Sequence, residues 1–217
     1  MRQLVIWGAS GHALVVADIV RLAGSHEIAG FLDNVNTERH NAPFCGARIL
    51  GGTEQLDRLR ENGVTDLIVA IGDCGARVKA AALAKKKGFT IATAIHPRAT
   101  IASDALIGEG TVVAAGAVVN PGARIGCNVI LNTSCSIDHE CAIADGAHIG
   151  PGVHLGGKVT IGEAVWIGIG AAVRDQITIG AGSMIGAGAV ALKDIPPGVV
   201  AYGVPAQVIR PVEKRND

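Results

Sequence analysis

An aliphatic residue stands at every sixth position from residue 101 to residue 191, without a slip. The series is Ile101, Ile107, Val113, Val119, Ile125, Leu131, Ile137, Ile143, Ile149, Leu155, Ile161, Ile167, Val173, Ile179, Ile185 and Ala191. A period of six matches neither the turn of an α-helix nor the repeat of a coiled coil. It predicts a solenoid, in which short units stack and the aliphatic side chains point inward to form one continuous core.

The composition agrees with a thin core that has glycine at its corners. The chain has 217 residues, of which 30 are Gly and only 3% are aromatic. Glycine beside each inward residue suits a tight corner, where a side chain would clash or φ becomes positive. The 19 basic and 19 acidic side chains cancel, and no basic patch is present. The sequence therefore predicts no nucleic-acid partner.

The cysteines and the N-terminus bear on the cellular compartment. None of the five cysteines forms a CxxC pair, and Cys135 and Cys141 fall on the second inward position of the repeat, which predicts buried thiols. The opening MRQLVIWGASG lacks the layout of a signal peptide, and no apolar run is long enough to span a membrane. These features predict a cytoplasmic protein without a membrane span.

The first part of the chain has a different pattern, in which short runs of apolar residues alternate with segments whose apolar residues recur at helical spacing. We expect strands at 4–7, 28–32, 66–71 and 90–94, and helices at 13–22, 53–60 and 76–87, with Thr53 as an N-cap. This alternation predicts a small parallel α/β domain of Rossmann-like type over residues 1–96. The solenoid domain follows over residues 97–217, and its last segment, near 199–211, should form a cap over the exposed core.

Polar and glycine residues follow three of the expected strands. They are Gly8, Ser10, Gly11 and His12 after the first strand, Asp33 and Asn34 after the second, and Gly72 and Asp73 after the third. Ligands of doubly wound sheets bind at the carboxyl ends of the strands, and the free N–H groups of a helix start can hold a phosphate. We therefore predict a nucleotide site here, with Asp33 accepting a nucleotide hydroxyl or base N–H. The alternative is a tight turn with Asp33 as an ordinary turn residue.

The solenoid resembles the left-handed parallel β-helix of the hexapeptide-repeat acyltransferases, and the segment 202–206, YGVPA, resembles that family's terminal signature. The GASGH turn and the domain that precedes the repeats extend the resemblance to one subfamily. These are the nucleotide-sugar N-acetyltransferases of bacterial glycan pathways, including perosamine and pilin-glycosylation acetyltransferases, with sialic acid O-acetyltransferases as relatives. The resemblance implies triangular coils of three hexapeptides and an N-terminal domain that binds the nucleotide-linked sugar. It also implies that acetyl-CoA lies along the β-helix between subunits of a homotrimer.

The sequence Asp138-His139-Glu140 follows an inward residue and should lie on the outer surface. Acetyl transfer to an amine needs a base, and a histidine oriented by a carboxylate suits that role. Both flanking carboxylates are candidates on spacing alone. The resemblance implies that His139 is the general base and Glu140 its orienting acid. It also implies that His148 and Gly157 lie around the thioester, and that Asn132 faces the sugar.

The later coils carry two glycine-rich segments, at 167–170 and 185–188, that expose the main chain. Such surfaces allow a pantetheine arm to lie flat, so we predict coenzyme contacts at Ile169, Gly170, Ala187 and Gly188. The alternative is that these are only corner glycines. Lys193 and Arg210 are further candidates for contacts with the coenzyme phosphates.

Three alternatives remain beside N-acetylation of a UDP- or GDP-linked amino sugar. The acceptor could be a sugar hydroxyl, as in sialic acid O-acetylation, or the solenoid could be a non-catalytic nucleotide-binding scaffold. A zinc site of the kind found in γ-class carbonic anhydrases, which share this solenoid, needs a closely spaced histidine pair. The spacing of His139, His148 and His154 does not supply that pair, so we predict no metal.

Overall fold

The structure of the protein is a computed structural model that describes residues 1–213, and the chain divides into two compact units. The first unit is Met1–Pro97, and the second begins at Arg98. The α/β fold of the first unit and the β-helix of the second confirm the predicted fold class.

The first unit is built on one six-stranded sheet with the strand order β3-β4-β2-β1-β5-β6. Its strands are β1 (Arg2–Trp7), β2 (His26–Leu32), β3 (Pro43–Phe44), β4 (Ala47–Gly51), β5 (Asp66–Val69) and β6 (Thr90–Ile91), and β7 (Ala94–Ile95) follows. Its helices are α1 (Gly11–Ala23), α2 (Leu56–Glu61) and α3 (Cys74–Lys86), with 3₁₀ turns η1 (Thr37–Arg39) and η2 (Thr53–Gln55). The pairs are parallel except for the β3–β4 hairpin. Parallel strands joined by helices are the predicted Rossmann-like arrangement.

Strand β1 lies at the point where the strand order reverses. The chain continues from β1 to β2 and β4 on one side, and later returns to β5 on the other side of β1. Gly8 follows β1 with a φ of +133°, and a Cβ built there would lie 2.5 Å from the carbonyl oxygen of Ala70. Only glycine allows the two chain segments to approach this closely. This switch point is the edge at which the sequence places the nucleotide site.

The structure differs from the expected elements of this unit in two places. The helix expected at 53–60 starts as the 3₁₀ turn η2, with Gly52 rather than Thr53 at the N-cap position. The Thr53 hydroxyl instead accepts a hydrogen bond from the Asn34 side chain at 3.1 Å, so the N-cap prediction was wrong. The strand expected at 90–94 is divided into β6 and β7.

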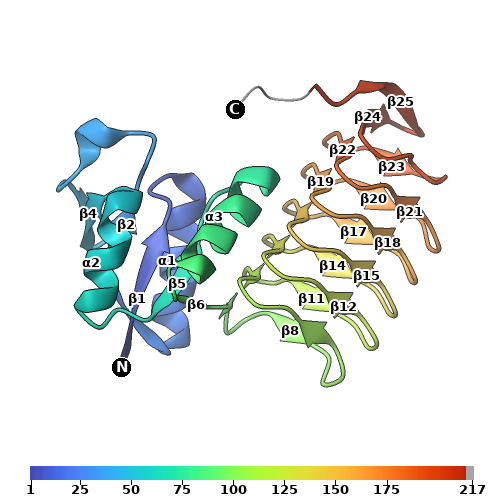
Figure 1. The fold of residues 1–217 in the computed structure, drawn as a ribbon. Helices are drawn as coiled ribbons and strands as arrows, with labels where there is room; N and C mark the ends of the chain where they lie inside the picture. The colour runs from blue at the N-terminus through green and yellow to red at the C-terminus, as the bar shows by residue number, and fades with distance from the viewer. Residues whose placement is uncertain (214–217) are drawn as a thin grey trace. The chain divides into compact units, whose positions relative to one another are not determined.

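The second unit is a solenoid of two-residue strands arranged in three parallel walls (Figure 1). Wall 1 contains β10 (Val112–Val113), β13 (Ile130–Leu131), β16 (His148–Ile149), β19 (Trp166–Ile167) and β22 (Met184–Ile185). Wall 2 contains β8 (Thr100–Ile101), β11 (Val118–Val119), β14 (Ser136–Ile137), β17 (His154–Leu155), β20 (Ala172–Val173) and β23 (Val190–Ala191). Wall 3 contains β9 (Leu106–Ile107), β12 (Arg124–Ile125), β15 (Ala142–Ile143), β18 (Thr160–Ile161) and β21 (Thr178–Ile179).

Each coil takes eighteen residues, so a residue lies beside its equivalent in the next coil. Ser136 of β14, for example, pairs with His154 of β17, and their side chains are bonded across that interval. The second residue of each strand points inward, and from Val113 onward these side chains are at most 4% exposed. Cys135 and Cys141 lie in the same core, as predicted. Burial raises the pKa of the Cys135 thiol to about 12, because the thiolate would be desolvated.

The solenoid ends in an antiparallel hairpin, formed by β24 (Val199–Gly203) and β25 (Ala206–Pro211). Strand β24 pairs in parallel with β22 of wall 1, in the segment where the sequence predicts a cap. Hydrogen bonds to the last coil satisfy backbone groups that a solenoid end would otherwise leave open.

Candidate active site

The predicted base His139 and its predicted partner Glu140 lie on the turn between β14 and β15, where wall 2 passes into wall 3. The Nδ1 atom of His139 lies 3.2 Å from Oε2 of Glu140. Successive side chains of a strand point to opposite faces, but Glu140 has a φ of +56°. This left-handed corner brings the two neighbouring side chains together, so the geometry supports Glu140 as the partner of the imidazole.

Asp138, the other candidate carboxylate, has a different function. Its Oδ1 atom accepts hydrogen bonds from the backbone N–H of His139 at 2.7 Å and from Nδ2 of Asn120 at 2.9 Å. The hydrogen bond from Asn120, followed by that from His139, lowers the pKa of the Asp138 carboxyl. Asp138 therefore fixes the backbone of the turn, and Glu140 is left as the acid that contacts the ring.

The equivalent turn of the next coil places Gly157 and Lys158 against this pair. A Cβ built at Gly157 would lie only 2.5 Å from Nε2 of His139, so the imidazole rests on the glycine backbone. The Gly157 N–H makes no hydrogen bond within residues 1–213. It can therefore donate to an oxygen atom near the ring, and its contact with the thioester remains a prediction.

Lys158 also contacts the pair formed by His139 and Glu140. Its Nζ atom lies 3.5 Å from the same oxygen of Glu140 that contacts His139, and its backbone N–H donates to the carbonyl of His139 at 2.9 Å. The hydrogen bond with His139, and then the charge of Lys158, lower the pKa of Glu140. Glu140 is therefore an ionised carboxylate at neutral pH.

The predicted residues His148 and Asn132 form a second group, on wall 1 and the turn that follows β13. Nε2 of His148 lies 3.3 Å from Nδ2 of Asn132. The imidazole also packs edge-to-face against Trp166 of the next coil, with ring centroids 6.1 Å apart. These contacts give the ring a defined direction on the outer face of the wall.

One chain does not bring the two groups together. His139 lies on the corner between wall 2 and wall 3, whereas His148 lies on wall 1. In a three-walled coil, a corner lies opposite the wall that does not form it. His139 and His148 therefore lie on opposite sides of the solenoid of a single chain.

The predicted coenzyme residues lie on the turns that lead from wall 1 to wall 2. Gly170 and Gly188 have φ values of +68° and +65°, and a Cβ at either site would meet no atom within 4 Å. Their own N–H groups bond to the coil below. The N–H groups of Ile169 and Ala187 make no hydrogen bond in the described part of the chain, so they are the donors that a ligand could reach. Arg210 lies 3.4 Å from Glu213.

The loop after β2 uses the Asp33 carboxylate internally. Its oxygens accept hydrogen bonds from the N–H groups of Val35 and Asn36 and from the Asn36 amide, at 2.9, 3.1 and 3.0 Å. Burial tends to raise the pKa of Asp33, but these bonds and the charge of Arg39 outweigh it, and the pKa is lowered. Asn34 is also engaged, because it accepts a hydrogen bond from Trp7. Both side chains hold the loop in place, and direct contact with a nucleotide remains a prediction.

The other predicted nucleotide residues lie at two helix starts. Ser10 precedes α1 without a side-chain capping bond, and Gly11 has open space where a Cβ would be. His12 lies in the first turn of α1. Gly72 is also open, and Asp73 caps α3 by accepting from the N–H of Ala76 at 2.9 Å. An uncapped helix start beside glycine suits an anion.

Sequence reasoning missed Lys158 and Trp166. Each stands eighteen residues after a predicted site residue, Lys158 after Glu140 and Trp166 after His148. The register of the repeat could have identified both, because residues one coil apart are neighbours in the solenoid.

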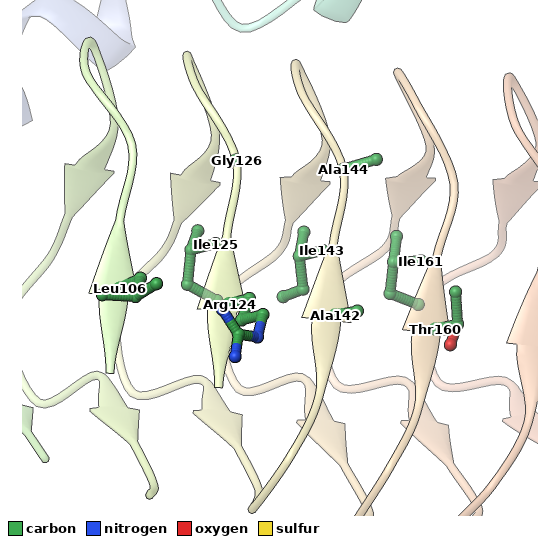
Figure 2. A pocket seen from close by; sticks show the side chains of 9 residues that line it. All are labelled: Leu106, Arg124, Ile125, Gly126, Ala142, Ile143, Ala144, Thr160 and Ile161. Carbon is green, nitrogen blue, oxygen red and sulfur yellow. The ribbon is translucent and has the colours of Figure 1, made fainter. Parts of the chain in front are cut away.

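A shallow hollow lies on the outer surface around wall 3, and none of the predicted site residues lines it (Figure 2). Its lining repeats from coil to coil, with Ile125, Ile143 and Ile161 below the surface. Apart from Arg124 and Thr160 its side chains are hydrocarbon, so it offers no acid–base group. Among residues 1–213, no cluster of three or more His, Cys, Asp or Glu could hold a metal, and no helix is long and apolar enough to cross a membrane.

Two family models match the chain. The PglD N-terminal domain matches residues 3–83, and the bacterial transferase hexapeptide (six repeats) matches residues 158–191. No curated protein sequence gives a significant match.

Several solved structures match almost the whole chain. Perosamine N-acetyltransferase from Caulobacter crescentus, a histidine-to-asparagine variant in complex with CoA and GDP-perosamine, is 37% identical with a TM-score of 0.92; the match covers 96% of this chain and 97% of that one. The acetyltransferase domain of PglB from Neisseria gonorrhoeae FA1090, with acetyl coenzyme A, is 40% identical with a TM-score of 0.90 and coverages of 96% and 99%. WeeI from Acinetobacter baumannii AYE is 25% identical, with a TM-score of 0.87 and coverages of 96% and 100%.

The similarity therefore extends through both units and includes the order in which they occur. The chain belongs to the hexapeptide-repeat sugar N-acetyltransferases that carry a PglD N-terminal domain, a family of acetyl-CoA-dependent enzymes.

Proposed function

We propose that this protein transfers the acetyl group of acetyl-CoA to the amine of a nucleotide-linked amino sugar. The observation that carries the proposal is the corner at which His139 contacts Glu140 and rests on Gly157. The relative from Caulobacter crescentus is a perosamine N-acetyltransferase described with CoA and GDP-perosamine, so a GDP-linked amino sugar is the first acceptor to test, and a UDP-linked one the second.

The proposed reaction is a direct attack on the thioester. The amine nitrogen bonds to the carbonyl carbon while Nε2 of His139 takes the amine proton. The C–S bond then breaks, and the CoA thiolate leaves and receives that proton. Glu140 stabilises the imidazolium formed in between, and the N–H of Gly157 donates to the developing oxyanion.

His148 and Asn132 enter the same site only if a second chain supplies them. In one chain, Asn132 lies on the turn that enters wall 2 and His139 on the turn that leaves it. Rotational symmetry can bring the turn between walls 1 and 2 of one copy against the turn between walls 2 and 3 of the next copy. We therefore propose a homotrimer with three equivalent sites between subunits, each holding acetyl-CoA along the turns that contain Ile169 and Ala187.

The N-terminal unit would hold the nucleotide. We assign Gly8, Ser10, Gly11 and His12 to the phosphates, and the Asp33–Asn34 and Gly72–Asp73 loops to the rest of the nucleotide. Both substrates are metabolites of the cytoplasm, where we place the reaction.

A thiol-release assay tests the proposed function. Acetyl-CoA is offered with GDP- and UDP-linked 4-amino sugars and, separately, with sialic acid. We expect rapid release of CoA with one nucleotide amino sugar, and a loss of a hundredfold or more in H139A, the usual size of a general-base contribution. T160A, an exposed change on wall 3 outside the site, should retain full activity.

Other outcomes of this assay would change the assignment. Release only with sialic acid would indicate O-acetylation. Near-full activity of H139A would rule out the proposed base. No release with any acceptor and no binding of acetyl-CoA would favour the non-catalytic scaffold.

A further inference from the structure

We propose that Lys158 is a positioning residue of the active site, which acts on the base His139 through their common partner Glu140. The inference rests on the proposed function in taking His139 as the base. The relation among the three side chains follows from the described contacts alone.

The contacts of Glu140 carry the inference. Its Oε2 atom lies 3.2 Å from Nδ1 of His139 and 3.5 Å from Nζ of Lys158. One carboxylate oxygen is thus shared between an imidazole and an ammonium group. The three residues occupy the same corner of two consecutive coils, and Glu140 and Lys158 both have left-handed backbone, with φ values of +56° and +59°. The N–H of Lys158 also bonds to the His139 carbonyl, which keeps the two corners in register.

The shared oxygen has a consequence for catalysis. A carboxylate that gives its full charge to an imidazole favours the protonated ring, which is not a base. The ammonium group of Lys158 competes for the negative charge of Glu140, so the attraction between Glu140 and a protonated imidazole is weaker. It also restricts the rotation of the Glu140 side chain. Lys158 thus weakens the preference of Glu140 for the protonated ring, while Glu140 still orients the imidazole.

The other charged groups on this stack of turns do not take over this role. The Asp138 carboxylate is occupied by the His139 N–H and Asn120. Arg174 and Asp175 belong to the turn one coil beyond Lys158. On the other side of Glu140, towards the start of the solenoid, Asp104 accepts a hydrogen bond from the Gly122 N–H. Within residues 1–213, Lys158 is the cation that pairs with Glu140.

The test compares K158M with K158R. Both replacements are unbranched, so the strain of a positive φ at position 158 is the same as in the parent chain. In K158M, we expect the acid limb of the pH profile of kcat/KM to move to higher pH by about half a unit, the size typical of an exposed ion pair. Activity would then fall about threefold below the midpoint and match the parent enzyme well above it. K158R should retain the parent profile.

A second measurement does not depend on the acceptor. The imidazole signal of His139 is identified by NMR through its absence in H139N, and its titration midpoint is followed in each variant. K158M should raise the midpoint by the same amount, and the difference should become much smaller when E140Q is present in both members of the pair.

Superimposable titration curves for K158M and the parent chain would overturn the inference. So would a K158M variant that changes only the KM for acetyl-CoA, because that result would assign Lys158 to the coenzyme phosphates. A parent protein that titrates as expected but transfers no acetyl group would leave the role of Lys158 standing and contradict the proposed function.

Discussion

At the scale of single residues, Gly157 sets the position of the base. Its φ is ordinary, but a Cβ there would lie 2.5 Å from Nε2 of His139. We therefore expect G157A to fold normally and to displace the imidazole from the reacting amine. Because small misplacements of a catalytic group lower rates strongly, kcat should fall roughly tenfold to a hundredfold, as measured by thiol release.

The matched control for that variant is G75A, at a glycine in helix α3. The nearest atom to a Cβ there is a carboxylate oxygen of Asp73 at 3.6 Å, an ordinary contact. G75A should retain the parent kcat. Equal activity of G157A and G75A would show that the ring does not depend on the glycine surface.

At the scale of elements, the loop after β2 is held by the ionised Asp33 carboxylate. The side chain is buried, with three donors from residues 35 and 36. D33A should lower the free energy of unfolding by about 1–3 kcal/mol, measured by urea titration at pH 7. The pKa of Asp33 is lower in the folded state, so this stabilisation is complete above the ordinary carboxyl pKa and is lost as the pH falls through the folded value. The difference between the parent and D33A should therefore begin to shrink as the pH falls below about 4. A constant difference down to pH 2 would exclude the charge as its source.

At the scale of the whole molecule, the separation of His139 from His148 predicts that activity can be restored between chains. H139A and H148A should each be nearly inactive alone, because one lacks the proposed base and the other the histidine expected beside the thioester. In the proposed trimer, assembled from both variants, a chain with intact His139 can meet a neighbour with intact His148. With equal coexpression, about a quarter of the interfaces would join an intact His139 on one chain to an intact His148 on the next. Roughly a quarter of the parent activity should therefore return. Mixed trimers without any recovery would show that each chain completes its own site.

The six-residue period by itself determined the solenoid and its core, because a side chain that leaves the register would expose an aliphatic group and bury a polar one. The length of a coil, and with it the stacking of Gly157 on His139, did not follow from the period alone; the structure shows the contact. Strand-to-helix patterns predicted the α/β unit and its switch-point edge.

The tertiary structure decided the features that depend on the direction of side chains and on contacts across coils or loops. It shows that Glu140, and not Asp138, contacts the His139 ring. The left-handed backbone at Glu140 brings the two side chains together, and Asn120 of the preceding coil binds Asp138. Sequence spacing encodes neither contact. The structure showed that the Asp33 carboxylate accepts hydrogen bonds from its own loop. It also placed His139 and His148 on opposite sides of one solenoid, because half a coil of sequence carries a residue from a corner to the opposite wall.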